Sequence, residues 1–206
     1  LVDALAGAER AGSARLFSTS AVGYYGYAGD EPLTEESPPG DDFLAVLSRD
    51  WEEEALRARK AGAGVGILRF GVVLGGEEGA LAKMVPLFRR YLGGPLGSGE
   101  QWFSWIHIQD LAAIYRFVMG RPDLEGPLNC TAPRPVRNRE LTRALAGALE
   151  KPAFMPPVPG FAIRAVLGEF GNVLLKGQRV IPERLTREGF TFRYPDIEGA
   201  LDDLLG

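Results

Sequence analysis

The chain has 206 residues, 46% of them hydrophobic, and this length suffices for one substantial core. Its formal net charge is −4 with both signs interspersed, so it offers no basic stripe for nucleic acid, and its single cysteine and single histidine exclude an internal disulfide and a Cys/His zinc site. No apolar run approaches the roughly 20 residues that span a bilayer, so we expect a cytoplasmic protein without a nucleic-acid, membrane or metal partner.

The first half of the chain alternates between helical and strand patterns. In chain order we predict a helix over 1–6, a strand over 15–20, an irregular loop over 26–42, a helix that Asp41 and Asp42 cap and that runs to about 61, a strand over 65–70 and a helix over 80–92. This alternation is typical of half of a doubly wound parallel sheet.

The second half begins with a segment too rich in glycine for a regular element, Gly93–Gly99. In chain order we then predict a strand over 102–108, a helix over 110–119 that Asp110 caps, a strand over 127–131, a helix over 138–149 that Asn138 caps, a helix over 161–167, and small helical and strand pieces from 181. A proline-rich link follows residue 150. We therefore expect two parts, residues 1–150 and a small appended domain over 151–206.

The segment that follows the first predicted strand, Ser18–Gly26, combines hydroxyl and glycine residues. Open α/β sheets place their ligands at the carboxyl ends of their strands, and the hydroxyl of Ser20 is suited to bind a carbonyl or hydroxyl of a substrate. Serine and glycine are equally ordinary turn formers after a strand. Local sequence leaves both interpretations open.

Two further segments are candidates for binding. His107 lies between apolar neighbours, where a histidine is more often a hydrogen-bonded structural residue than a catalytic base. The glycine-rich segment is able to hold a phosphate through backbone N–H groups, with Arg89 and Arg90 just before it. No GxxxxGK[ST] or GxGxxG pattern supports the phosphate interpretation.

Four segments in this order resemble an atypical branch of the extended short-chain dehydrogenases, the epimerase-family SDR39U type, whose members are labelled nucleotide-sugar epimerases. They are Ser20–Gly26, Leu68–Gly75, Gly93–Gly99 and Trp105–Asp110. The likeness continues to the tail at Leu175–Leu185, which resembles the small C-terminal domain of that branch.

The resemblance implies an NAD(P)-binding α/β fold, a Rossmann-like doubly wound parallel sheet with a small C-terminal α+β subdomain. The family begins with a TGxxGxxG unit that nothing here matches, so we expect that roughly 90 N-terminal residues, the first half of the sheet, are missing. It implies binding of NADP or NAD by Ser18, Ser20, Arg69, Gly71, Val72 and Val73, and of a small-molecule substrate such as a nucleotide sugar by Gly97, Ser98, Trp105 and His107. We expect the ends of the Ser20 and Arg69 strands to converge on one cleft that faces the nicotinamide ring.

The sequence departs from the wider superfamily at the catalytic pair. Active members carry a Tyr-x-x-x-Lys pair that moves a proton while hydride passes to NAD(P), and alignment through Trp51–Glu52 puts Leu44 and Ser48 at these positions. Two hypotheses follow. In the first, the protein is an epimerase or oxidoreductase in which Ser20 polarises the substrate oxygen and Tyr24 or Tyr25 moves the proton, although an aromatic packing role suits this pair too. In the second, it is a non-catalytic dinucleotide-binding regulatory protein.

Overall fold

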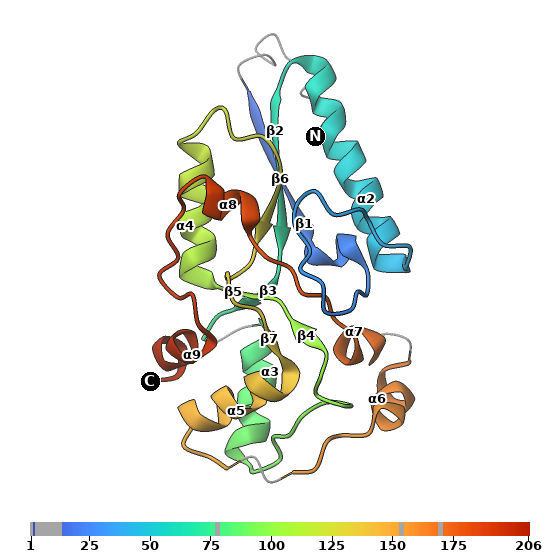
Figure 1. Cartoon of the computed structure of the whole chain (residues 1–206), viewed down its shortest axis with the longest axis vertical. Helices are drawn as coiled ribbons and strands as arrows, with labels where there is room; N and C mark the ends of the chain where they lie inside the picture. Colours follow the sequence, from blue (N-terminus) through green and yellow to red (C-terminus); the bar gives the residue numbers. More distant parts are fainter. Residues whose placement is uncertain (1, 3–13, 77–78, 153–154, 169–170) are drawn as a thin grey trace.

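The centre of the molecule is a three-stranded parallel sheet in the order β1 (Arg15–Ala21), β2 (Gly64–Phe70) and β6 (Gly126–Cys130) (Figure 1). The computed structural model describes residues 2, 14–76, 79–152, 155–168 and 171–206. The three predicted strands are confirmed, and the Rossmann-like α/β class with a parallel sheet is confirmed with them. The helix predicted over residues 1–6 lies, apart from residue 2, outside the described residues.

Helices cover both faces of this sheet (Figure 1). Successive side chains of a strand point to opposite faces, and Ser20 contacts α2 (Phe43–Leu56), whereas Thr19 lies 3.0 Å from the Tyr115 hydroxyl of α4 (Ile108–Met119). The central strand β2 is therefore buried on both sides, which explains its nearly continuous apolar sequence.

The start of α2 confirms the cap predicted at Asp42. One oxygen of the Asp42 carboxylate accepts the backbone N–H groups of Leu44 and Ala45, each at 3.0 Å. Asp41 is exposed and precedes the capping position. The helix ends in a short 3-10 segment, η3 (Arg57–Ala61), before β2 begins.

A second group of elements lies beyond the carboxyl ends of the central strands. It consists of α3 (Gly79–Arg89), α5 (Asn138–Ala148), α9 (Ile197–Leu205), the parallel pair β3 (Val72–Leu74) with β5 (Trp105–His107), and the antiparallel pair β4 (Trp102–Phe103) with β7 (Val136–Arg137). Their core is apolar and includes Leu81, Trp105, Leu145 and Leu201, all fully buried. The strand predicted over 102–108 is thus two short strands with different partners.

Two predicted helix caps are wrong. The cap of α4 is His107, whose Nδ1 accepts the N–H of Gln109 at 3.1 Å, and Asp110 instead accepts two backbone N–H groups of the distant segment at Arg193 and Tyr194, each at 2.9 Å. The cap position of α5 is Arg137, while the Asn138 amide oxygen accepts the Leu96 N–H at 2.8 Å. In both cases the polar side chain accepts a backbone N–H group far along the chain, and it therefore does not cap its own helix.

The segment after residue 150 packs on the earlier elements. It contains α6 (Gly160–Leu167), α7 (Gly171–Leu175), α8 (Glu183–Arg187) and α9. From 181 onward the described residues form helices and no strand, so the strand pieces predicted there are absent. No helix in the described part of the chain has both the length and the apolar character to cross a membrane. The division of the chain at residue 150 stays a prediction.

The Asp42 cap generates a stability prediction. In the full-length protein, Asp42→Ala is expected to lower the free energy of unfolding by about 1 kcal/mol, because two N–H groups of the first turn of α2 lose their acceptor. Asp42→Asn keeps an acceptor and should stay within a few tenths of a kcal/mol of the parent. Urea unfolding measures both, and an equal loss in the two variants would contradict the cap.

Candidate functional site

Polar side chains meet at the carboxyl ends of the three central strands. Ser20, Arg69 and Asn129 lie opposite one another in neighbouring strands. Hydrogen bonds join them to three other buried side chains from α2, the turn after β1 and the following loop. We call this set the strand-end network, which consists of Ser20, Tyr25, Glu35, Glu52, Arg69 and Asn129.

The ion pair between Glu52 and Arg69 lies at the centre of the network. Arg69 Nε donates to Glu52 Oε1 at 2.8 Å and Arg69 Nη2 donates to Oε2 at 2.7 Å, a bidentate arrangement. The side chains are 4% and 7% exposed. Burial alone lowers the pKa of Arg69, but the bonds to Glu52 and Tyr25 outweigh it, so the pKa is raised. The guanidinium of Arg69 therefore keeps its charge at any physiological pH.

The Tyr25 hydroxyl is fully engaged in the network. It accepts from Arg69 Nη1 at 2.9 Å and donates to Asn129 Oδ1 at 2.7 Å. Burial raises the pKa of Tyr25 to about 12, although the charge of Arg69 acts in the opposite direction. Tyr25 is therefore a neutral phenol whose only proton already has an acceptor.

Glu35 ties the network to the loop after β1 and to the C-terminal segment. Its carboxylate accepts the backbone N–H of Asn129 at 2.9 Å and that of Arg184, in α8, at 3.3 Å. Burial raises the pKa of Glu35, and these N–H donors act against it. The Asn129 amide also donates to the Ile181 carbonyl at 3.0 Å. Three segments distant in sequence thus meet at one carboxylate.

Ser20 and Tyr24 differ in the freedom of their hydroxyl groups. Ser20 is 9% exposed and donates its proton to Glu52 Oε1 at 2.7 Å. Tyr24 is half-buried, the guanidinium of Arg69 lies 3.5 Å from the centre of its ring, and within the described residues its hydroxyl has no hydrogen-bond partner. Among the three hydroxyls predicted to be catalytic, only that of Tyr24 is free to act on a ligand.

The residues predicted to bind the cofactor occupy different environments. Ser18 is half-buried and accepts the indole N–H of Trp51 at 3.2 Å, and Arg69 is buried as described. A side chain at Gly71 would lie 2.7 Å from the Ser104 carbonyl oxygen, so this glycine permits the close approach of the backbone between β4 and β5. Val72 is 37% exposed and Val73 is half-buried. The ends of β1 and β2 are hydrogen-bonded neighbours. That they line one cleft facing a nicotinamide ring stays a prediction.

The residues predicted on the substrate side fall into two groups. Trp105 and His107 are fully buried, and the His107 ring stacks on Tyr194 with 3.9 Å between the ring centres. This burial favours a packing role for both. Gly97 is half-buried with a φ of 57°, and Ser98 is exposed beside it. Of these four, only Gly97 and Ser98 present surface to a ligand.

Sequence reasoning missed Glu52, Glu35 and Asn129 as members of the network. Two of them carried a signal: Glu52 shares the buried face of α2 with Ala45 and Ala55, and Asn129 interrupts the apolar strand β6. An acid or amide at a core position needs a partner. Glu35 lies in an irregular loop, where no periodicity marks it.

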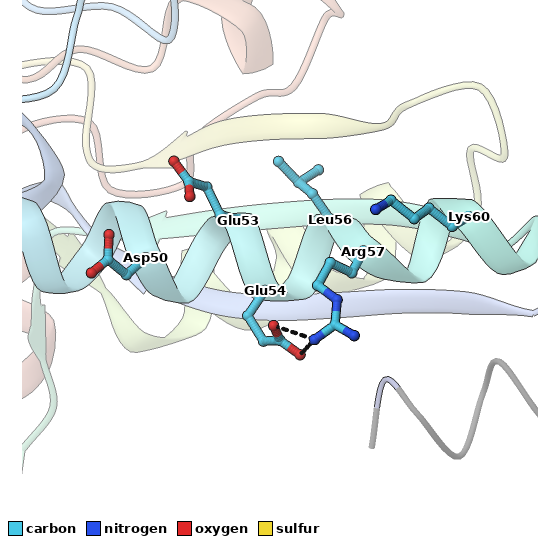
Figure 2. A pocket seen from close by; sticks show the side chains of 6 residues that line it. All are labelled: Asp50, Glu53, Glu54, Leu56, Arg57 and Lys60. Atoms are coloured by element: carbon cyan, nitrogen blue, oxygen red, sulfur yellow. Dashed lines mark hydrogen bonds and ion pairs between the residues drawn. The ribbon is translucent and has the colours of Figure 1, made fainter.

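Other features of the described residues do not compete with this site. No group of three or more His, Cys, Asp or Glu side chains in the described ranges is arranged to hold a metal ion. A surface hollow of about 470 Å³ lies along α2 and η3 (Figure 2). Its lining is charged apart from Leu56, and Glu54 and Arg57 form an ion pair at 2.7 Å within it. Ligand pockets are mostly apolar.

The chain is similar in sequence to known protein families. Residues 1–130 match the model of the NAD dependent epimerase/dehydratase family, and residues 158–204 match a domain of unknown function (DUF1731). The chain is 47% identical over 186 residues to the Arabidopsis thaliana epimerase family protein SDR39U1 homolog, chloroplastic, covering 90% of this chain and 53% of the relative. It is 44% identical over 192 residues to the Mycobacterium tuberculosis epimerase family protein MT2273, covering 93% and 64%.

Two solved structures of related proteins share the fold of this chain. The nucleoside-diphosphate sugar epimerase from Corynebacterium glutamicum superposes with a TM-score of 0.81 at 38% identity, covering 100% of this chain and 40% of that one. Human epimerase family protein SDR39U1 with NADPH gives 0.80 at 34% identity, covering 92% and 64%. The chain therefore spans less than two thirds of the length of each of these relatives.

The buried ion pair generates a second stability prediction. Glu52→Gln is expected to cost the full-length protein about 3–5 kcal/mol of unfolding free energy, because the Arg69 charge stays buried without its counterion. The matched control is Glu53→Gln on the same helix, where the side chain is 70% exposed. Surface pairs contribute at most about 1 kcal/mol. Equal denaturation midpoints for the two variants would refute the role of the ion pair.

His107 generates a pH prediction. Burial lowers its pKa below the usual value, and Asp203 and Asp110 only partly compensate. The unfolded chain then binds the proton more readily, so the stability of the folded state is fully present above about pH 6.5 and falls as the pH drops through the lowered pKa.

The check is the free energy of unfolding measured between pH 5 and pH 8 in the full-length protein and in His107→Asn. Asparagine keeps a capping acceptor for α4, so the helix should still form in the variant. The free energy of unfolding of the variant should, however, depend less on pH, because the contribution of His107 is absent. An unchanged slope between these pH values would show that His107 titrates normally.

Proposed function

Because the chain belongs to the NAD dependent epimerase/dehydratase family and to its SDR39U type, we propose that the complete protein binds NAD or NADP at the carboxyl ends of β1 and β2. Open α/β sheets bind ligands in the crevice outside these ends. The human SDR39U1 structure was solved with NADPH. The observation that carries the proposal is the strand-end network, since it gives two neighbouring strand ends one fixed geometry.

We place the nicotinamide ring, as part of this proposal, against the surface beside the network. Ala21 is exposed at the end of β1, Val72 is 37% exposed at the start of β3, and the half-buried Tyr24 follows Ala21 closely. All three are uncharged and present flat or small surfaces. We assign the ring contact to Ala21 and Val72, with Ser18 and Val73 flanking it, and assign to the buried Arg69 a positioning role. When bound, NAD(P) supplies the donor or acceptor of hydride.

We further propose an oxidoreductase or epimerase reaction at a hydroxyl-bearing carbon. In the direction of carbonyl reduction, the Tyr24 phenol donates its proton to the carbonyl oxygen as hydride reaches the carbon, and the product is an alcohol. Ser20 and Tyr25 act indirectly, because their protons are bound by Glu52 and Asn129. The Glu52 carboxylate and the Tyr25 hydroxyl oxygen accept from Arg69 and so hold its guanidinium over the Tyr24 ring.

A nucleotide sugar is the substrate that we propose. The Corynebacterium structure carries the name nucleoside-diphosphate sugar epimerase, and Gly97 and Ser98 are the members of the predicted substrate side that reach the surface. We retain residues 151–206 as a small C-terminal domain that completes the substrate side. A cytoplasmic location stays a prediction, since the Arabidopsis relative is named chloroplastic.

A second candidate function is dinucleotide binding without catalysis. It is favoured by α2, where Leu44 and Ser48 lie beside Gly23, 3.6 and 3.9 Å from the position of an added side-chain carbon. These are the positions where the resemblance expects tyrosine and lysine. Incubation of the full-length protein with NADPH or NADP⁺ and a panel of nucleotide sugars separates the two functions. An oxidoreductase changes the cofactor absorbance, and an epimerase converts the sugar to its epimer without a net change in that absorbance. The regulatory protein binds the cofactor saturably and converts no sugar.

Tyr24 generates the catalytic prediction. In the full-length protein, Tyr24→Phe should lower kcat by about 10²-fold or more, because the proton donor is lost, while NADPH affinity and thermal stability stay near those of the parent. Tyr25→Phe should instead lower thermal stability, because Asn129 and Arg69 lose a buried partner. Turnover that survives Tyr24→Phe but not Tyr25→Phe would reverse the assignment.

A further inference from the structure

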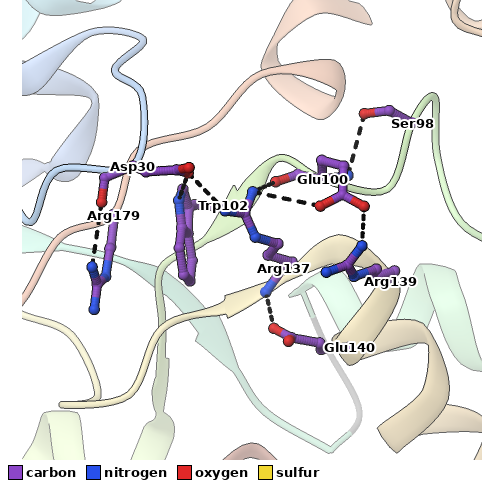
Figure 3. A network of polar contacts seen from close by, with 8 residues as sticks. All are labelled: Asp30, Ser98, Glu100, Trp102, Arg137, Arg139, Glu140 and Arg179. Carbon is purple, nitrogen blue, oxygen red and sulfur yellow. Dashed lines mark hydrogen bonds and ion pairs between the residues drawn. The ribbon is translucent and has the colours of Figure 1, made fainter.

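Three arginines from two segments of the chain meet on the surface beside the glycine-rich segment (Figure 3). Arg137 ends β7, Arg139 lies in the first turn of α5, and Arg179 lies in the extended segment before α8. We call them the arginine cluster. Ser98, within the glycine-rich segment, and Glu100, just after it, lie within the same group of side chains (Figure 3).

The indole of Trp102 holds two of the guanidinium groups in place. The guanidinium carbon of Arg137 lies 4.5 Å from the centre of the Trp102 ring and that of Arg179 lies 5.1 Å from it, on opposite sides of the indole (Figure 3). The Arg137 side chain is only 20% exposed. Guanidinium groups stacked in this way lose less conformational entropy when they bind a ligand than free surface arginines do.

Two exposed carboxylates accept hydrogen bonds from arginines of this cluster. Asp30 accepts from Arg137 Nη2 at 2.7 Å and from the Trp102 indole at 2.8 Å, and these bonds hold its pKa below the usual range. Glu100 accepts from Arg139 and lies 3.7 Å from Arg137 Nη1. The side chains of Asp30 and Glu100 are 74% and 47% exposed.

The Glu100 carboxylate presents its two oxygens to two arginines, as a phosphate group is able to do. Each of the two carboxylates carries one negative charge, whereas a diphosphate brings two or three charges and more acceptor oxygens. The Ser98 hydroxyl oxygen accepts the Glu100 N–H at 3.2 Å, so its own proton is available to a ligand oxygen. The cluster therefore has the donors that a diphosphate needs, with internal anions bound to them.

We propose that the arginine cluster binds the diphosphate group of the substrate, and that Asp30 and Glu100 are internal competitors which the diphosphate displaces. The proposal rests on the proposed function for the assignment of that diphosphate to a substrate. Asp30 belongs to the loop between β1 and α2, and the same loop is fixed further on, where Leu33 bonds to Arg179 and Ile181 and where Glu35 joins the strand-end network. Displacement thus frees the Asp30 end of the loop and leaves the network intact.

The test is calorimetric titration of the full-length protein with UDP, inorganic pyrophosphate and uridine. Asp30→Asn and Glu100→Gln should each bind UDP and pyrophosphate about three- to tenfold more tightly than the parent, because a competing charge is removed. Arg139→Gln, at a residue 43% exposed, should bind them about tenfold more weakly. Uridine, which has no phosphate, should not distinguish the variants. The matched control is Asp50→Asn, an exposed carboxylate on α2, which should leave all affinities unchanged.

Three outcomes would overturn the proposal: unchanged or weaker UDP binding in both Asp30→Asn and Glu100→Gln, an equal gain in Asp50→Asn, or unchanged UDP binding in Arg139→Gln. A titration of UDP into protein saturated with NADPH identifies the source of the diphosphate. UDP affinity should persist there, and its loss would mean that the cluster holds the cofactor diphosphate instead. The proposed function is judged separately, by NADPH binding to the parent: its absence contradicts that function even if the carboxylate variants gain affinity.

Discussion

The bidentate ion pair between Glu52 and Arg69 is the constraint on which the site depends. A buried guanidinium without a counterion is strongly unfavourable, so α2 must pack where Glu52 reaches β2. This position of α2 also brings Glu52 to the Ser20 hydroxyl, and the remaining donors of Arg69 then orient the Tyr25 hydroxyl. One helix-to-sheet contact thereby sets the geometry of both strand ends.

The loop between β1 and α2 connects the strand-end network to the arginine cluster. Near Tyr25 and Glu35 it is held by buried hydrogen bonds, which are costly to break because the groups would lose their partners away from water. At Asp30 it is held by exposed contacts to Trp102 and Arg137, which water and competing anions weaken. The same loop is therefore rigid where it borders the proposed proton donor and exchangeable where it borders the arginine cluster.

Sequence patterns predicted what depends on local or topological rules. The strand at Arg15–Ala21 and the Asp42 cap follow from neighbouring residues, and the meeting of the Ser20 and Arg69 strand ends follows from parallel topology. The caps expected at Asp110 and Asn138 were wrong because each side chain binds a backbone group far along the chain. The role of Glu52 needed both the register of the sheet and the rotation of α2, which no local pattern contains.

Tyr24 and Tyr25 are consecutive residues with opposite roles, and the difference comes from the sheet rather than from the tyrosines. Tyr25 points to Asn129 and Arg69, which use both its proton and its lone pair, whereas Tyr24 receives from Arg69 only a charge over its ring. The resemblance expects a lysine to place positive charge beside the catalytic tyrosine. Here Arg69 is the cation at the Tyr24 ring, and Glu52 keeps it protonated and fixed. The ion pair that positions the helix is thus the one that supplies the charge next to the proposed proton donor.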